Sequence, residues 1–195
     1  PVEALQEAYE AGQRIFGESK VQEMTQKYEV LPKDIEWHFI GHLQTNKIKY
    51  MAPYVSLIHG VDSYKLLVEI NKQAIKAGRI IPCLLQIHIA QEETKFGFSC
   101  EEGKEMLMAG EWKSLKNISL CGIMGMATNT EDEEEIRKEF QSLRNFFQEI
   151  KQGFFSEDSA FKEISMGMSD DYPLAIEYGS TLIRIGSRIF GNRYY

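Results

Sequence analysis

Short apolar runs alternate with longer segments of helical periodicity along the whole chain. The runs predict seven strands, at Arg14–Gly17, Trp37–Ile40, Val55–Ile58, Pro82–Ala90, Leu120–Met126, Ile164–Met168 and Leu182–Ile185. The segments between and around them predict helices at Val2–Gly12, Ser19–Val30, Leu43–Met51, Ser63–Ala77, from Ser99 onward, and at Thr130–Lys151, Tyr172–Tyr178 and Ser187–Phe190. Regular alternation of strand and helix favours a parallel α/β fold.

Local signals mark the ends of several of these helices. Ser19 and Ser99 are each followed three residues later by Gln or Glu, which predicts a capping box at both. Thr130 is the predicted N-cap of the longest helix, whose first turn is acidic as the helix dipole prefers. Ser63 is a further predicted N-cap, and Gly78 is a typical residue to end the helix it begins.

The count of strands predicts a barrel. Eight strand–helix units close a TIM barrel, and this sequence opens on a helix with no strand before it. We therefore expect a (β/α)8 barrel, a single domain over residues 1–195, whose first strand lies just upstream of Pro1. A doubly wound open sheet is the alternative, but it would require a Gly-rich turn early in the chain, and the sequence has none there.

Composition narrows the class of protein. The net charge of −7 argues against a nucleic-acid-binding protein or one that binds an anionic membrane. No apolar run approaches the roughly 20 residues of a membrane helix, and no signal peptide is visible. Cys83, Cys100 and Cys121 are too few and scattered for a disulfide framework, so we expect a reducing compartment and a cytoplasmic location.

The last two strand-to-helix turns carry the strongest functional signal. Residues 165–171 and 184–188 form the turns after the last two predicted strands, where a TIM barrel places its phosphate site. Gly186 allows close backbone approach to an anion, the amides of Gly186 and Ser187 open a helix, and Ser169 adds a hydroxyl. The turns predict a phosphate site; a tight turn and a helix cap without a ligand is the alternative.

Arg184 interrupts an apolar strand. Its side chain alternates with those of Ile183 and Ile185, so we expect it to point into the barrel. A buried guanidinium needs an acceptor. Two interpretations stay open: a structural ion pair with Glu177 or Asp171, or an acceptor on a ligand near the phosphate.

Several blocks of sequence together point to one family. They are Phe16-Gly17-Glu18, Val21-Gln22-Glu23, residues 37–44 (WHFIGHLQ), Asn46-Lys47, residues 165–169 (SMGMS), Gly179-Ser180-Thr181, residues 184–187 (RIGS) and Ile189-Phe190-Gly191. In this order, over essentially the whole chain, they resemble the signature blocks of the pyridoxal phosphate homeostasis proteins (YggS/PROSC type).

The resemblance implies a fold and a cofactor. It implies a single barrel like the N-terminal domain of alanine racemase, which carries pyridoxal 5′-phosphate as a Schiff base, usually without clear turnover. By motif match, Ser169 and the amides of Gly186 and Ser187 would hold the phosphate, and Arg184 would face the pyridine nitrogen. Met168 would wall the flat ring. Two residues complete the predicted cofactor-binding set: Ser19 and Asn46.

The chain departs from the family pattern in two places. The lysine that forms the Schiff base lies on the family's first strand, a few residues before the position of Pro1, and so outside this sequence. Lys47, Lys49 and Lys95 are interpreted as surface or loop charges. Ser19 stands where the family commonly has Asn, which replaces a carboxamide by a shorter hydroxyl.

The expected chemistry favours holding the cofactor over turning it over. A guanidinium donates a hydrogen bond but does not supply a proton, so the ring nitrogen would stay neutral and be a poor electron sink. The racemase route also needs a tyrosine from a C-terminal β-domain, and the sequence ends nine residues after Gly186 with only Tyr194 and Tyr195. We expect a monomeric carrier or reservoir that hands pyridoxal phosphate to apo-enzymes.

Other functions remain as alternatives. A pyridoxal phosphate-dependent amino-acid racemase is the main one, followed by a phosphosugar-type barrel enzyme and, more distantly, an interaction module. His38 and His42 are four apart but straddle a strand end and Gly41, so no metal site is expected there. His59 and His88 lie in predicted strand runs and are interpreted as structural imidazoles.

Overall fold

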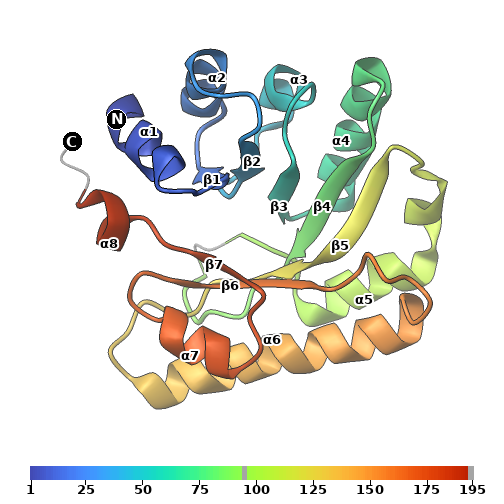
Figure 1. The fold of residues 1–195 in the computed structure, drawn as a ribbon. Helices are drawn as coiled ribbons and strands as arrows, with labels where there is room; N and C mark the ends of the chain where they lie inside the picture. Colours follow the sequence, from blue (N-terminus) through green and yellow to red (C-terminus); the bar gives the residue numbers. More distant parts are fainter. Residues whose placement is uncertain (94–95, 193–195) are drawn as a thin grey trace.

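Seven parallel strands form one curved sheet, and the helices cover its outer side (Figure 1). The structure, a computed structural model, describes residues 1–93 and 96–192. Every neighbouring pair is parallel, in the sheet order β1-β2-β3-β4-β5-β6-β7. The strands are β1 (Ile15–Glu18), β2 (Glu36–Phe39), β3 (Leu57–Val61), β4 (Ile81–Gln86), β5 (Ile118–Met124), β6 (Glu163–Met168) and β7 (Leu182–Arg184).

The helices follow the strands in the expected alternation. They are α1 (Val2–Glu10), α2 (Val21–Val30), α3 (Ile48–Met51), α4 (Tyr64–Ala77), α5 (Cys100–Ala109), α6 (Glu133–Phe154), α7 (Tyr172–Glu177) and α8 (Ser187–Phe190), with 3₁₀ turns η1 (Thr45–Lys47) and η2 (Glu111–Ser114). The alternating parallel architecture predicted from the sequence is confirmed. Within the described ranges, no helix is long and apolar enough to cross a membrane.

Side chains from the two faces of the sheet fill two separate spaces. The outer face packs against the helices in one large core, with Trp37, Phe39 and Phe140 among its fully buried members. On the inner face, Leu57, Leu84 and Met124 form a small apolar cluster, against which Leu182 packs. This cluster lies in the barrel lumen. Side chains two residues later on these strands face the same space, nearer to the carboxyl-end mouth of the barrel.

The barrel formed by these strands is nearly closed. Among the described residues β1 and β7 each pair on one side only. At these edges Ile15 of β1 is 41% exposed and Ile183 of β7 is 38% exposed. The eighth strand expected upstream of Pro1 lies outside the sequence and stays a prediction.

Of the four predicted N-caps, two are confirmed and two are wrong. Ser63 accepts a hydrogen bond from the amide of Leu66, and Ser99 and Glu102 form the predicted capping box. Ser19, in contrast, does not cap α2, which begins after Lys20 without a side-chain cap. The backbone of Ser19 instead meets Gly41 so closely that a Cβ at Gly41 would lie 2.2 Å from the Ser19 carbonyl oxygen.

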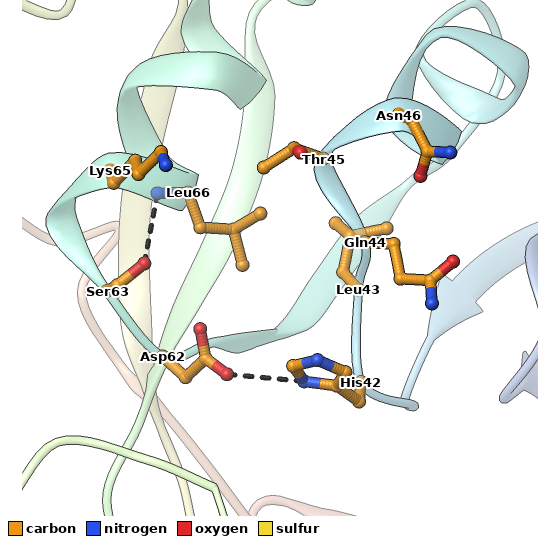
Figure 2. A pocket seen from close by; sticks show the side chains of 9 residues that line it. All are labelled: His42, Leu43, Gln44, Thr45, Asn46, Asp62, Ser63, Lys65 and Leu66. Carbon is orange, nitrogen blue, oxygen red and sulfur yellow. Dashed lines mark hydrogen bonds and ion pairs between the residues drawn. The ribbon is translucent and has the colours of Figure 1, made fainter.

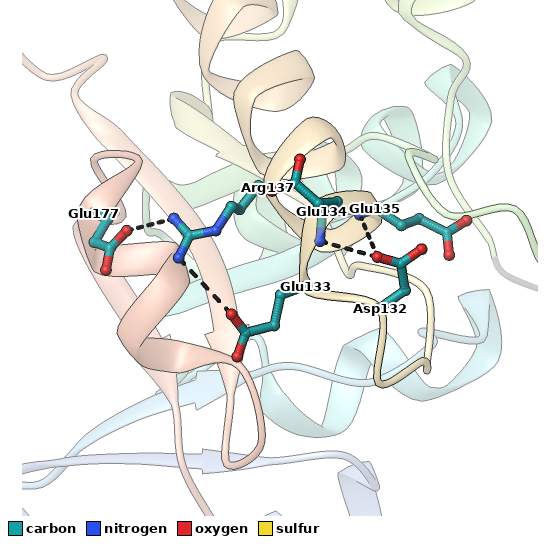
Figure 3. Close-up of polar contacts among 6 residues, drawn as sticks. All are labelled: Asp132, Glu133, Glu134, Glu135, Arg137 and Glu177. Atoms are coloured by element: carbon teal, nitrogen blue, oxygen red, sulfur yellow. Dashed lines mark hydrogen bonds and ion pairs between the residues drawn. The ribbon is translucent and has the colours of Figure 1, made fainter.

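The N-cap of α6 is also corrected. Asp132, not Thr130, caps this helix: its carboxylate accepts from the amides of Glu134 and Glu135 (Figure 3). The hydroxyl of Thr130 accepts from the amide of Asp132 and so supports the cap from two residues before it. A carboxylate is the better acceptor at the positive end of a helix dipole, so it takes the capping position.

Other boundaries shift by a few residues. The predicted helix Leu43–Met51 is η1 followed by the short α3. The predicted strand Pro82–Ala90 ends at Gln86, because the chain then pairs with the incoming loop: the Gln86 side chain donates to the carbonyl oxygen of Phe96, and Ile87 bridges to Phe98. The turn η2 was not predicted.

Candidate functional site

The two predicted phosphate turns lie next to one another. Met168, at the end of β6, is in register with Arg184, at the end of β7. Just beyond them the Ser169 hydroxyl accepts a hydrogen bond from the amide of Gly186 at 3.3 Å. The structure therefore brings together the two turns that are far apart in the sequence, at the carboxyl-end mouth of the barrel where such folds build their sites.

The β7 turn is open to a ligand. Gly186 and Ser187 are exposed, and a Cβ added at Gly186 would meet nothing within 4 Å. Within the described ranges the Ser187 amide donates to no backbone carbonyl. On the β6 side the Met168 amide donates to a carboxylate oxygen of Asp171 at 2.7 Å, and the Met168 side chain is 46% exposed. Of the amides at this mouth, that of Ser187 thus remains available to a ligand, with the apolar side chain of Met168 nearby.

Arg184 points into the lumen, as predicted. It follows Leu182 on the inner face, and its Nη2 donates to the carbonyl oxygen of Gly125 at 3.1 Å. Its Nη1 is fully buried and has no hydrogen-bond partner among the described residues. Loss of hydration lowers the pKa of Arg184 to about 10, against the opposing charge of Asp171, so the guanidinium stays protonated at neutral pH.

The structural alternative for Arg184 is not what the structure shows. Glu177, one of its two possible partners, is bound by Arg137, which also approaches Glu133 (Figure 3). Among the described residues Asp171 forms no ion pair with Arg184 within 4.0 Å and instead accepts a hydrogen bond from the Met168 amide. A buried donor without a partner costs free energy, which makes the Arg184 Nη1 a marker for a missing acceptor.

Three polar side chains cross the lumen beside Arg184. His38 Nδ1 lies 2.9 Å from His59 Nε2, and His59 Nδ1 lies 2.8 Å from the Ser165 hydroxyl. All three residues are buried. Burial lowers the pKa of His38 to about 4 and that of His59 well below its usual value, where the charges of His38 and Arg184 act in the same direction. Both imidazoles are therefore neutral at physiological pH.

Asn46 lies in a different part of the mouth. It is exposed on η1 and lines a cavity of about 480 Å³ between the turns after β2 and β3 (Figure 2). In that cavity His42 Nδ1 lies 3.3 Å from a carboxylate oxygen of Asp62, and the His42 ring stacks on Phe96 at 3.8 Å. Ser19 follows β1 and is exposed. In the sheet order, the strands that precede Ser19 and Asn46, β1 and β2, are separated from β6 and β7 by β3, β4 and β5.

Sequence reasoning missed two of these arrangements, the His42–Asp62 pair and the His38–His59–Ser165 chain. Each joins residues at or near the ends of different strands, so only the register of the sheet reveals it. The available signal for this arrangement was that His38 alternates with the apolar Trp37 and Phe39, which places its side chain on the opposite face of the strand.

Several earlier interpretations concern residues at the margins of the site. Lys49 is exposed and Lys47 is half-buried, its ammonium 6.0 Å from the Tyr50 ring. Lys95, Arg193, Tyr194 and Tyr195 lie outside the described residues. Across residues 1–93 and 96–192, no group of three or more His, Cys, Asp or Glu side chains could hold a metal ion.

Comparison with known proteins assigns this architecture. The sequence profile of the family described as "Alanine racemase, N-terminal domain" matches residues 2–194. A pyridoxal phosphate homeostasis protein of Aquifex aeolicus is 40% identical over 197 residues, which is 100% of this chain and 84% of the relative. The chain belongs to the pyridoxal phosphate homeostasis protein family. A further member of this family, from Schizosaccharomyces pombe, is 36% identical over 99% of this chain and 80% of its own length.

Solved structures agree with the assignment to this family. PipY of Synechococcus elongatus, solved without PLP, superposes with a TM-score of 0.90 at 35% identity, over 98% of this chain and 88% of that one. The same protein with PLP bound gives a TM-score of 0.86 at 34% identity over the same shares. An alanine racemase of Clostridium difficile gives 0.74 at 13% identity, over 100% of this chain and 48% of its own, which shows the shared barrel fold.

Proposed function

We propose that this chain binds pyridoxal 5′-phosphate at the mouth formed by β6 and β7 and serves as an intracellular carrier or reservoir of that cofactor. The observation that carries the proposal is the buried, unpartnered Nη1 of Arg184 beside two adjacent turns, one of which presents the exposed amide of Ser187. PipY, a relative of this chain, is known with PLP bound.

The residues present fit the cofactor. The amides of Gly186 and Ser187 and the hydroxyl of Ser169 would hold the phosphate, since backbone amides and hydroxyls are the donors that phosphate oxygens accept from. Arg184 Nη1 would donate to the pyridine nitrogen, which supplies the missing acceptor. When bound, the cofactor supplies a reactive aldehyde and an electron-withdrawing ring.

The charge state of Arg184 favours holding over turnover. With a pKa of about 10 the guanidinium keeps its proton at neutral pH, so it orients the ring nitrogen without protonating it. Its bond to Gly125 fixes the rest of the side chain in the lumen. Without a proton on the ring nitrogen, the site stabilises negative charge on the ring poorly, which supports a carrier without efficient catalysis of its own.

The proposal also covers the contacts to the ring, the lysine that attaches the cofactor, the location and the oligomeric state. Met168 would cover one face of the ring, while Ser19 and Asn46 would approach from the β1 and β2 side. The lysine that attaches the cofactor would lie upstream of Pro1. The carrier would act as a cytoplasmic monomer and deliver pyridoxal phosphate to apo-enzymes.

Paired titrations of the full-length protein test this function. Pyridoxal phosphate and pyridoxal, which lacks the phosphate, are titrated into wild type and Ser169→Ala while absorbance is followed. We expect Ser169→Ala to weaken pyridoxal phosphate about tenfold, the cost of one hydrogen bond to a charged group, and to leave pyridoxal unchanged. Equal loss for both ligands would refute the phosphate assignment.

Two further measurements separate the carrier from its alternatives. Borohydride reduction followed by peptide mapping should place the adduct on a lysine upstream of Pro1. Incubation with D- or L-alanine should give no interconversion of the enantiomers. Efficient interconversion would establish the racemase, and the absence of any new absorbance band on addition of pyridoxal phosphate would favour the phosphosugar enzyme.

A further inference from the structure

The His38–His59–Ser165 chain has no role in the function proposed above. It joins β2, β3 and β6 across the lumen through two hydrogen bonds of 2.9 and 2.8 Å. Its members are 7%, 2% and 0% exposed, so water replaces none of these contacts easily. Such a chain between buried groups requires that every donor meets an acceptor, which restricts where its protons can lie.

The serine end sets the direction of the chain. Among the described residues, His59 Nδ1 is the only hydrogen-bond partner of the Ser165 hydroxyl. If His59 Nδ1 carried the proton, the buried Ser165 hydroxyl would have no acceptor for its own hydrogen. The satisfied arrangement therefore has Ser165 donating to His59 Nδ1 and the proton of His59 on Nε2.

The direction of donation at His59 then fixes the tautomer of His38. Because His59 Nε2 donates, His38 Nδ1 must accept, and the single proton of a neutral His38 lies on Nε2. That Nε2 has no hydrogen-bond partner among the described residues, and it is not one of the fully buried unpartnered atoms, so it is open to the lumen. The residue in register with His38 on β1 is Gly17, which offers no side chain to accept this hydrogen.

We propose that His38 Nε2–H is a ligand-binding hydrogen-bond donor, held in this tautomer by His59 and Ser165, and that it recognises a lone pair on an oxygen or an unprotonated nitrogen of the ligand in the lumen. His38 touches the ligand, whereas His59 and Ser165 are positioning residues. With Arg184 Nη1, the lumen presents two fixed donors, one charged and one neutral.

The pair of donors selects a chemical class of ligand. A flat heterocycle with two acceptors, one on a ring nitrogen and one on a ring substituent, satisfies both donors, and a ligand that presents an ammonium group to His38 does not. Pyridoxal phosphate belongs to the favoured class, so this inference rests on the proposed function for the identity of the ligand. The tautomers themselves do not depend on it.

The first experiment uses the protein alone. Long-range proton–nitrogen NMR spectra of full-length protein with ¹⁵N-labelled histidine at pH 7 report the tautomer of each imidazole, with His38 assigned from the His38→Gln variant. We expect the Nε2–H form for both His38 and His59. The Nδ1–H form at His38 would overturn the inference, whatever ligand the protein binds.

The second experiment adds pyridoxal phosphate as the probe. The His38 Nε2–H proton should slow its exchange with water on binding and move downfield. In Ser165→Ala the His59 tautomer should become mixed, and binding should weaken about three- to tenfold. Ser119→Ala is the control: Ser119 does not belong to the His38–His59–Ser165 hydrogen-bond network, so both the tautomer and the binding should stay unchanged. Pyridoxal phosphate binding that leaves the His38 signals unmoved refutes the donor role but not the proposed function. Failure of the wild type to bind it refutes the proposed function and the assigned ligand together.

Discussion

Replacing Arg184 by methionine separates the cost of this residue to the folded protein from its benefit to the bound ligand. Methionine keeps an unbranched, flexible side chain that can fill part of the same space, and it removes the charge and the donors. Because Nη1 is buried without a partner, the free protein already bears part of the cost of holding a guanidinium in the lumen. We expect the free protein to tolerate the change and the ligand not to.

The magnitude follows from the pKa and the single hydrogen bond. A fall from 12.5 to about 10 corresponds to about 3 kcal/mol against the charged form in the folded protein. The folded-state pKa is depressed below that of the unfolded chain, so this cost is present in full at neutral pH and disappears only as the pH rises toward 12.5. The substitution also removes the bond from Nη2 to Gly125, worth about 1.5–3 kcal/mol. The two nearly cancel, so the free energy of unfolding should change by about 1 kcal/mol or less.

Thermal unfolding and ligand titration measure the two sides separately. The free Arg184→Met protein should melt within about 4 °C of wild type, whereas its dissociation constant for pyridoxal phosphate should rise about 10- to 100-fold through loss of a charged donor. Arg137→Met is the matched control: it removes an arginine that joins α6 to α7, away from the mouth, and should leave the dissociation constant unchanged. A free Arg184→Met protein that is strongly destabilised but binds as wild type would refute the reasoning and make Arg184 a structural residue.

Three further predictions concern stability and are measured by thermal or denaturant unfolding. Asp132→Ala should cost about 1 kcal/mol through loss of the α6 cap, and Thr130→Ala clearly less; an equal loss would contradict the assigned cap. Phe140→Ala should cost about 3–5 kcal/mol, because its side chain is fully buried in the outer core, and a loss below 1 kcal/mol would mean that the core collapses around the cavity. Burial holds the pKa of His38 at about 4 against 6.5 in the unfolded chain, so the unfolded chain binds the extra proton and stability falls by up to about 3 kcal/mol as the pH drops from 6.5 to 4. His38→Gln should flatten this fall, and parallel curves for variant and wild type would show that His38 is not its source.

The order and type of the elements could be predicted because strands and helices have different hydrophobic periods. The apolar runs of β4, β5 and β6 and the amphipathic pattern of α4 and α6 are long enough to distinguish strand from helix. Parallel alternation then leaves few topologies, and the sheet order follows the sequence. The adjacency of Ser169 and Gly186 follows in turn, because the ends of neighbouring parallel strands meet at one edge.

What the sequence could not supply depends on tertiary contacts. Ser19 has the composition of an N-cap, but its backbone is needed for the close approach of Gly41, so the helix begins later. The bond between His59 and Ser165 joins residues 106 positions apart and depends on the exact stagger of strands at their irregular pairings. No local pattern contains that information.

The donors and acceptors at the mouth of the barrel are arranged as the proposed carrier function requires. Arg184 Nη1 and the amide of Ser187 are donors without partners among the described residues, whereas the nearby carboxylate of Asp171 already accepts the Met168 amide and opposes the fall in the pKa of Arg184. A group that abstracts protons at neutral pH needs a pKa near 7, and burial lowers that of the lumenal His38 to about 4. Donors fixed in the folded protein bind an anionic, acceptor-rich ligand without reorganisation, which agrees with the carrier function proposed above.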